Sequence, residues 1–152
     1  MKNFLIVIFC LLVCSQSCFA FDYYASCHYL DGIKGLSTTE DSMGCMSNYK
    51  LLDTNRSNLA YYTSGAKNYI NEVYLVLNFY YGSNKQVMHN SLVQASKTLS
   101  QKAINYNLPQ AIVTSLQNGN TGVWKHGSHI IRIKKEIFPS GRGYEIHFKI
   151  EE

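Results

Sequence analysis

Beyond residue 20 the sequence has no long apolar segment, and this absence excludes a membrane-spanning helix from that part of the chain. Internal repeats, low-complexity tracts and coiled-coil heptads are absent as well. A chain of 152 residues can bury one hydrophobic core but is short for two. We therefore expect a single domain over residues 21–152.

Charge of one sign is not in great excess. The chain has 14 Lys and Arg against 10 Asp and Glu, which gives a formal net charge of +4. Nucleic-acid-binding domains usually carry a stronger and more clustered positive charge. The composition therefore argues against nucleic acid as a partner.

Motifs of catalysis and metal binding are also missing. No cysteine has a partner at CxxC or CxxH spacing, and Gly127-Ser128-His129 lacks the pattern of a nucleophile elbow. His126 and His129 are close in sequence, but they point to opposite faces of an extended chain unless Gly127 redirects one, and a third ligand is lacking. We predict no catalytic residue, no metal site and no cofactor.

Residues 1–20 have the layout of a secretory signal peptide. A single positive charge at Lys2 precedes an apolar run from Phe4 to Val13, and a short polar stretch ends at Ala20. This pattern predicts cleavage after Ala20 and a periplasmic or secreted protein, with a composition typical of bacteria. The alternative is a lipoprotein acylated at Cys14 or Cys18, although the residues before each cysteine fit that signal poorly.

Only two of the five cysteines, Cys27 and Cys45, lie beyond residue 20. A cysteine pair in an oxidising compartment usually forms a disulfide. A crosslink over this separation stabilises a fold by about 3 kcal/mol in the chain-entropy model. We predict a Cys27–Cys45 disulfide.

Residues 21–52 contain two helix signals. Asp22 is a suitable N-cap for a short first helix, and Ser37 with Glu40 has the spacing of a capping box for a second. The disulfide would then join a helical hairpin. Residues 53–69 are rich in turn formers and are interpreted as a connection, in which residues 58–63 form a short strand or a helical turn.

Residues 70–152 have clearer periodicity. Apolar residues alternate over 70–81, which predicts a strand with Val73, Leu75, Leu77, Phe79 and Tyr81 on one face. Ser83 and Gln86 predict the start of a long helix, and Pro109 the first turn of another, closed by Asn118-Gly119. Strands are expected over 129–138 and 144–150, joined by the loop 139–143, with a short one near 122–127.

The predicted fold class is therefore α+β, with two layers: helices on one face of a small, mainly antiparallel sheet that ends in a C-terminal β-hairpin. The inner rows of that hairpin are Ile131, Ile133 and Ile137 on one strand and Tyr144, Ile146, Phe148 and Ile150 on the other.

The outward face of the C-terminal hairpin is the candidate binding surface. Alternation places six charged or titratable residues there: Arg132, Lys134, Glu136, Glu145, His147 and Lys149. Tyr74 and Tyr80 join them if strand 70–81 is a neighbour, and Arg142 lies at the loop tip. One interpretation is a solvated face whose charges pair with one another. The other is a docking surface, since Tyr and Arg are enriched at interface hot spots.

Tyrosine is abundant, with 12 residues, several in adjacent pairs such as Tyr61-Tyr62 and Tyr80-Tyr81. Neighbours in a strand face opposite ways, so one ring of each pair should be partly exposed. This composition favours a non-enzymatic module that binds another protein, such as an inhibitor or immunity factor. The alternative is a small envelope enzyme or ligand carrier with a site between the N-terminal helices and the sheet.

In size, compartment and its cysteine pair, the chain resembles secreted immunity proteins of interbacterial toxins. The resemblance extends to no individual residue.

Overall fold

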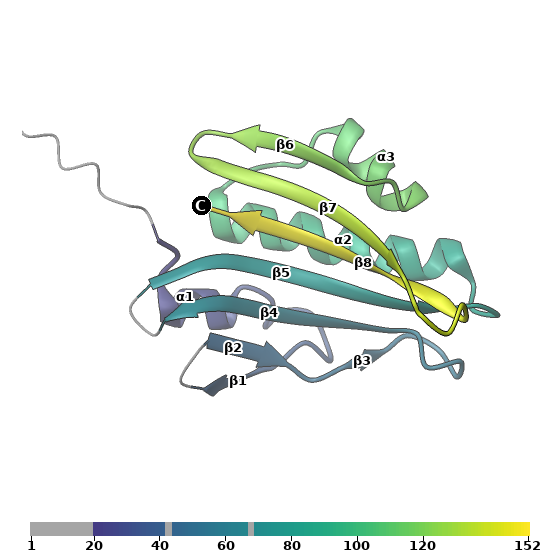
Figure 1. The fold of residues 1–152 in the computed structure, drawn as a ribbon. Coiled ribbons are helices and arrows are strands. Elements are labelled where there is room, and N and C mark those ends of the chain that lie inside the picture. Colours follow the sequence, from purple (N-terminus) through teal and green to yellow (C-terminus); the bar gives the residue numbers. More distant parts are fainter. Residues whose placement is uncertain (1–19, 42–43, 67–68) are drawn as a thin grey trace, which may run out of the picture.

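Antiparallel strands form one sheet that organises the whole domain (Figure 1). The computed structural model describes residues 20–41, 44–66 and 69–152. The strand order is β1-β2-β4-β5-β8-β7-β6, and β3 pairs with β4 outside this path. The strands are β1 (Thr38–Asp41), β2 (Gly44–Ser47), β3 (Lys50–Leu51), β4 (Asn58–Ala66), β5 (Tyr69–Tyr80), β6 (Gly122–His126), β7 (His129–Ile137) and β8 (Gly143–Glu151).

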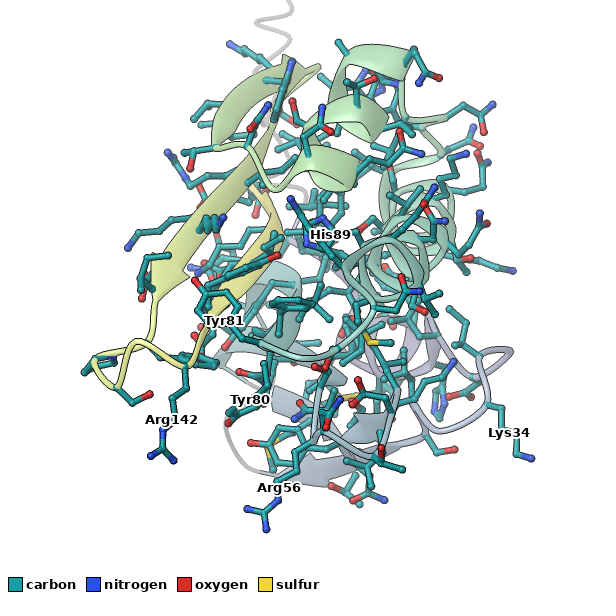
Figure 2. The ribbon with its side chains drawn as sticks, turned by 90° about the vertical axis from the view of Figure 1, so that its right-hand side faces the viewer. Lys34, Arg56, Tyr80, Tyr81, His89 and Arg142 are labelled. Atoms are coloured by element: carbon teal, nitrogen blue, oxygen red, sulfur yellow. A yellow bond between two sulfur atoms is a disulfide. The ribbon has the colours of Figure 1, made fainter. Side chains whose placement is uncertain are left out.

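The helices α1 (Tyr23–His28), α2 (Lys85–Ile104) and α3 (Gln110–Asn118) lie on one face of this sheet. Figure 2, turned by 90°, shows β7 and β8 on one side and the helices on the other. Apolar residues from the helices and from the inner sheet face form one buried cluster. The two-layer α+β fold is confirmed. Within the described residues, no helix combines the length and the apolar character that crossing a membrane requires.

The helix starts follow local hydrogen-bonding chemistry. Asp22 caps α1 as predicted, because its Oδ1 accepts the Ala25 N–H at 2.7 Å. The cap of α2 is Asn84, which accepts the Val87 N–H, and not Ser83. Ser83 instead hydrogen-bonds Ser57 across the loops, with 2.6 Å between the hydroxyl oxygens.

The prediction of a second N-terminal helix over 37–52 is wrong. This segment contains β1, β2 and β3, and β1 pairs with β2 as a hairpin. Gly44 lies against β4, where an added Cβ would come within 2.5 Å of the Thr63 hydroxyl. The Ser37–Glu40 spacing favours a helix locally, but pairing with neighbouring strands determines the structure of this segment. The disulfide joins a helix to a strand hairpin, and there is no helical hairpin.

The interpretation of residues 53–69 as a connection is also wrong over most of its length. Asn58–Ala66 is β4, which pairs with β5 in register from Asn58↔Asn78 to Ala66↔Tyr69. Leu59 and Tyr61 point into the core, and the turn-rich flanks on either side concealed this alternation. The segment is an interior strand of the sheet.

The predicted inner rows are confirmed with two exceptions. On β5, β7 and β8 the predicted core residues are buried except at the strand ends. Ile137, near the end of β7, is 59% exposed, and Tyr81 lies beyond β5 and is 57% exposed. Both residues follow the alternation but lie past the area that the helices cover.

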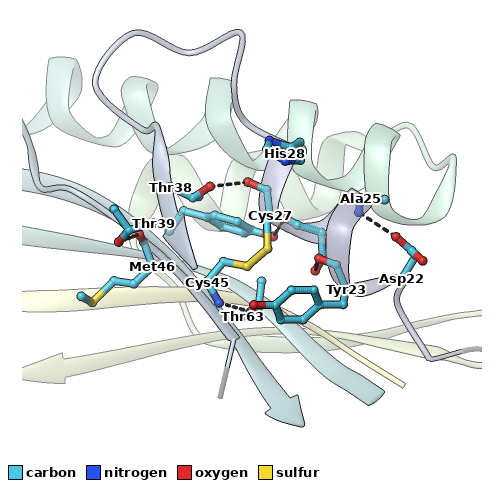
Figure 3. The surroundings of a disulfide bond; sticks show 12 residues. Asp22, Tyr23, Ala25, Cys27, His28, Thr38, Thr39, Cys45, Met46 and Thr63 are labelled. Atoms are coloured by element: carbon cyan, nitrogen blue, oxygen red, sulfur yellow. Dashed lines mark hydrogen bonds between the residues drawn. A yellow bond between two sulfur atoms is a disulfide. The ribbon is translucent and has the colours of Figure 1, made fainter. Parts of the chain in front are cut away.

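The Cys27–Cys45 disulfide is confirmed and links α1 to β2 (Figure 3). Within the described residues, one pair in register, Met46↔Tyr62, joins β2 to β4. Two side-chain hydroxyls add hydrogen bonds at this contact between β2 and β4, called the β2–β4 seam: Thr63 Oγ1 accepts the Cys45 N–H at 2.7 Å, and Ser47 Oγ accepts the Tyr61 N–H at 2.7 Å. The disulfide therefore holds the β1–β2 hairpin at the place where the backbone ladder is weakest.

Replacing Cys27 and Cys45 by Ser is expected to lower the free energy of unfolding by about 3 kcal/mol, because the crosslink restricts the unfolded chain. Urea denaturation of the oxidised wild type and the double variant measures the difference. A thiol reductant is the control: it should bring the wild type to the stability of the variant and leave the variant unchanged. Equal stability of oxidised wild type and variant would contradict the prediction.

Candidate functional site

The sheet face opposite the helices, called the outer face here, carries a row of large side chains. One residue from each of five neighbouring strands belongs to this row, and each is paired in register with the next: Met46 (β2), Tyr62 (β4), Tyr74 (β5), Lys149 (β8) and Arg132 (β7). The rings of Tyr62 and Tyr74 stack at 5.2 Å, and Lys149 Nζ lies 4.7 Å from the centre of the Tyr74 ring. The outer face thus has an aromatic half and a charged half.

In the charged half each predicted basic residue has an acidic partner. Arg132 makes two hydrogen bonds to Glu151, at 3.1 and 3.2 Å, and Lys149 donates to Glu72 at 2.7 Å. The other pairs run along a strand, Lys134 with Glu136 and His147 with Glu145. The hydrogen bond from Lys134 lowers the pKa of Glu136. The face is therefore close to electrically neutral.

The aromatic half is less polar and partly hollow. Met46 is 49% exposed, and a shallow hollow of about 300 Å³ lies beside it, lined in part by Tyr62, Tyr74 and Gly65. Burial raises the pKa of both Tyr62 and Tyr74, so both phenols are neutral hydrogen-bond donors at physiological pH. This combination of apolar rings and polar tips suits contact with another surface.

Three loops meet at one end of the sheet: residues 52–57, 81–84 and 138–142. The Tyr81 N–H donates to the Arg142 carbonyl at 2.9 Å, and the Asn55 side-chain amide donates to the Gly82 carbonyl at 3.1 Å. We call this group the loop end. Figure 2 shows Arg56 and Arg142 projecting from it, with Tyr80 between them.

The loop that presents Arg56 has a defined shape. Asp53 Oδ1 accepts the N–H groups of Asn55 at 3.0 Å and Ser57 at 3.1 Å. Arg56 has φ of 70°, a left-handed conformation that residues other than glycine seldom adopt. Within the described residues, neither Arg56 nor Arg142 forms an ion pair with an acidic side chain.

The predicted site residues thus fall into two groups. Tyr74, Arg132, His147 and Lys149 lie together on the outer face, while Tyr80 and Arg142 lie toward the loop end, with the Tyr80 ring 5.1 Å from that of Phe138. Sequence reasoning missed Met46, Arg56 and Tyr62, because it read their segments as helix or connection. The adjacent Tyr61-Tyr62 pair was the available signal: Tyr61 is fully buried and Tyr62 faces outward.

Among the described residues, the outer face has one group that could hold a metal ion, with ligand atoms within 4.8 Å of one another: Glu136, Glu145 and His147. Glu136 and Glu145 are cross-strand partners, so their charges repel. Lys134 and His147 offset this repulsion by pairing with the two carboxylates. The Lys134 charge thus offsets that of Glu136, and His147 is hydrogen-bonded to Glu145.

The two histidines of the β6–β7 turn have separate partners. His126 and His129 are paired in register across Gly127. The His126 ring stacks on Tyr106 at 3.7 Å, whereas the His129 ring stacks on Phe21 at 5.6 Å. Each imidazole is thus part of a packing contact.

His89 and Tyr144 form a buried polar pair beneath β8. His89 Nδ1 is 2.8 Å from the Gln117 carbonyl oxygen, and Nε2 is 2.8 Å from the Tyr144 hydroxyl. A carbonyl can only accept, so Nδ1 carries the proton and Nε2 accepts the hydroxyl proton of Tyr144. Burial lowers the pKa of His89 and raises the pKa of Tyr144 to about 12. The pair is fully hydrogen-bonded and neutral, as a structural pair requires.

The region between α1 and the sheet, predicted to hold the site of the alternative enzyme or carrier, is filled by apolar side chains. Leu30, Leu36 and Tyr61 are fully buried there, and the Tyr61 hydroxyl donates to the Ser26 carbonyl. Cys27 at this place is held in the disulfide with Cys45. These observations favour a surface site over an interior one.

Comparison with known proteins gives no match: no protein-family model, no curated protein and no solved structure is similar to this chain.

Replacing Tyr144 by Phe is expected to lower the free energy of unfolding by about 1–2 kcal/mol, because His89 Nε2 would remain buried without a donor. Chemical denaturation at pH 7 measures the loss. Tyr81→Phe removes the same hydroxyl from an exposed ring and should leave stability unchanged. Equal stability of the two variants would contradict the assignment of His89 as the acceptor.

Proposed function

We propose that the protein is an exported, non-enzymatic binding module that docks another protein through its outer face and loop end, as an inhibitor or immunity factor would. The observation that carries this proposal is the uncovered Tyr62–Tyr74 stack. All three helices pack on the opposite face, so these rings and Met46 form an accessible apolar surface on a neutral sheet.

Charge favours a partner with acidic residues next to an apolar patch. The cations of the outer face are already paired, so they add little net attraction. Arg56 and Arg142 are exposed and have no acidic partner in the described part of the chain, and guanidinium groups recognise carboxylates by parallel hydrogen bonds. The aromatic half would supply contact area, and the loop end would supply orientation.

Export is the second part of the proposal. The charged, apolar and polar zones of residues 1–20 match a signal peptide, and a disulfide is suited to an oxidising compartment. Phe21 is buried and Asp22 caps α1, so all of the described helices and strands lie after Ala20. Cleavage there would leave every helix and strand of the domain intact.

Two double variants should each lower the recovery of partner at least tenfold in a pulldown from bacterial envelope extract: Tyr62→Ala with Tyr74→Ala, and Arg56→Glu with Arg142→Glu. The first removes the apolar contact and the second reverses the unpaired charge. The matched control is Lys97→Glu with Lys102→Glu, which makes the same charge change on exposed positions of α2. Quantitative mass spectrometry of the captured proteins measures recovery.

Equal recovery by all four proteins would reject the docking surface. Loss of recovery only in the tyrosine variant would leave the sheet face as the site and remove the loop end from it.

Expression of the full chain in a bacterial host is expected to give an envelope or extracellular protein whose first residue is Phe21. Intact-mass measurement and N-terminal sequencing identify that residue. A lipid-modified first residue at Cys14 or Cys18 would instead support the lipoprotein alternative, and retention of residues 1–20 would contradict export.

A further inference from the structure

The start of the folded domain lies at one corner of the sheet. The Phe21 N–H donates to the Ile70 carbonyl at 2.8 Å, and the Glu152 N–H donates to the carbonyl of the next residue, Asn71, at 3.1 Å. Phe21 is therefore held against β5 beside the end of β8. Its ring is buried against the His129 ring.

Two polar atoms in this corner lack partners. Among the described residues, neither Glu152 Oε2 nor His129 Nδ1 has a hydrogen-bond partner, although both atoms are shielded from solvent. A buried polar atom without a partner usually destabilises a fold by about 1–3 kcal/mol. The two atoms are acceptors when Glu152 is ionised and His129 is neutral, so the corner is suited to a donor.

We propose that this corner is a binding site for the amino group that cleavage after Ala20 creates on Phe21. The inference rests on the processing step of the proposed function. Hydrolysis of the Ala20–Phe21 peptide bond by water leaves a carboxylate on Ala20 and an amine on Phe21, which takes up a proton to become an ammonium group. That group stays attached to the folded domain.

The chemistry of an ammonium group matches the corner, and that of the uncleaved amide does not. An amide has one N–H, and Phe21 already uses it on Ile70. An ammonium group has three, so it can keep that bond and direct the other two toward Glu152 and His129. Burial lowers the pKa of His129, which keeps the imidazole neutral and able to accept. Processing thus supplies a charge and two donors to the orphan acceptors.

Among the described residues, the titratable groups around the corner are Asp22, which caps α1, His126 and His129 on β6 and β7, and the Glu152 side chain after β8. The Asp22 carboxylate is engaged with the Ala25 N–H, which leaves Glu152 as the available counter-ion. Pairing with Glu152 raises the pKa of the amine in the folded state. The resulting stability is fully present below the pKa of the unfolded amine, about 7.7–8.0, and is lost as pH rises through the higher folded value.

The test uses the full chain exported and processed by a bacterial host. The pKa of the Phe21 amine is measured from the pH dependence of its labelling by an amine-reactive reagent, with the N-terminal peptide followed by mass spectrometry. The wild-type amine should have a pKa about one unit above its ordinary range. Glu152→Gln should return it to that range, whereas Glu40→Gln, which removes an exposed carboxylate on β1, should not.

Thermal melting gives a second readout. At pH 6 Glu152→Gln should melt about 3–5 °C below wild type and below Glu40→Gln, and at pH 10 this difference should disappear because the amine is neutral. An ordinary amine pKa in wild type, or a pKa unaffected by Glu152→Gln, would overturn the inference while leaving processing at Phe21 intact. A mature protein that begins elsewhere would overturn both the processing step and this site, and would leave the docking surface untouched.

Discussion

Backbone pairing of β5 on both sides is the interaction on which the rest of the structure depends. This strand pairs with β4 along one edge and with β8 along the other for nearly its whole length. Because its side chains alternate, Leu75 and Leu77 face the helices while Tyr74 faces outward. The same alternation, carried to the neighbouring strands by their register, buries one face of the sheet against the helices and leaves the other face uncovered.

Strand register also explains why the outer face carries many charged side chains but has a net charge close to zero. Lys149 is paired in register with Tyr74 on one neighbouring strand and with Arg132 on the other, and neither side chain can neutralise its charge. The carboxylate partner of Lys149 is Glu72 and that of Arg132 is Glu151, and these two glutamates face each other two residue pairs farther along the strands. The bidentate Arg132 contact fixes side chains that would otherwise move independently. The outer face therefore presents an aromatic surface with ordered, paired charges beside it.

Sequence periodicity predicted the elements whose packing agrees with their local signals. Met88, Leu92, Ala95 and Leu99 recur at helical spacing and are buried, and β8 shows strict alternation. Sequence periodicity gave the wrong secondary structure where contacts between residues distant in sequence decide which element forms. The Ser37–Glu40 spacing favours a helix locally, but this segment forms the edge of the sheet. There β1 pairs with β2, and the Cys45 N–H donates a hydrogen bond to Thr63 Oγ1 on β4. A single sequence does not show such contacts.

The residues of the candidate site likewise include some features that strand periodicity predicted and others that depend on the order of strands in the sheet. Alternation predicted that Arg132, His147 and Lys149 face outward, since that depends only on strand periodicity. It did not predict that Lys149 pairs with Glu72, which is 77 residues away, because that contact requires the sheet order. Arg56 lay in a segment with no recognised element, so nothing in its sequence indicated that hydrogen bonds would place its loop beside Arg142.

The seam between β2 and β4 has a consequence for the chain in a reducing environment. Two hydroxyl groups and one residue pair join these strands, and the disulfide anchors the outer hairpin to α1. Without that anchor, detachment of the hairpin would expose N–H and C=O groups of β4 on the side that β2 covers, up to the register shift at Ser64/Gly65. An exposed strand edge is a template for strand addition by another copy. By holding the hairpin in place, the disulfide would keep this edge covered as well as stabilise the fold.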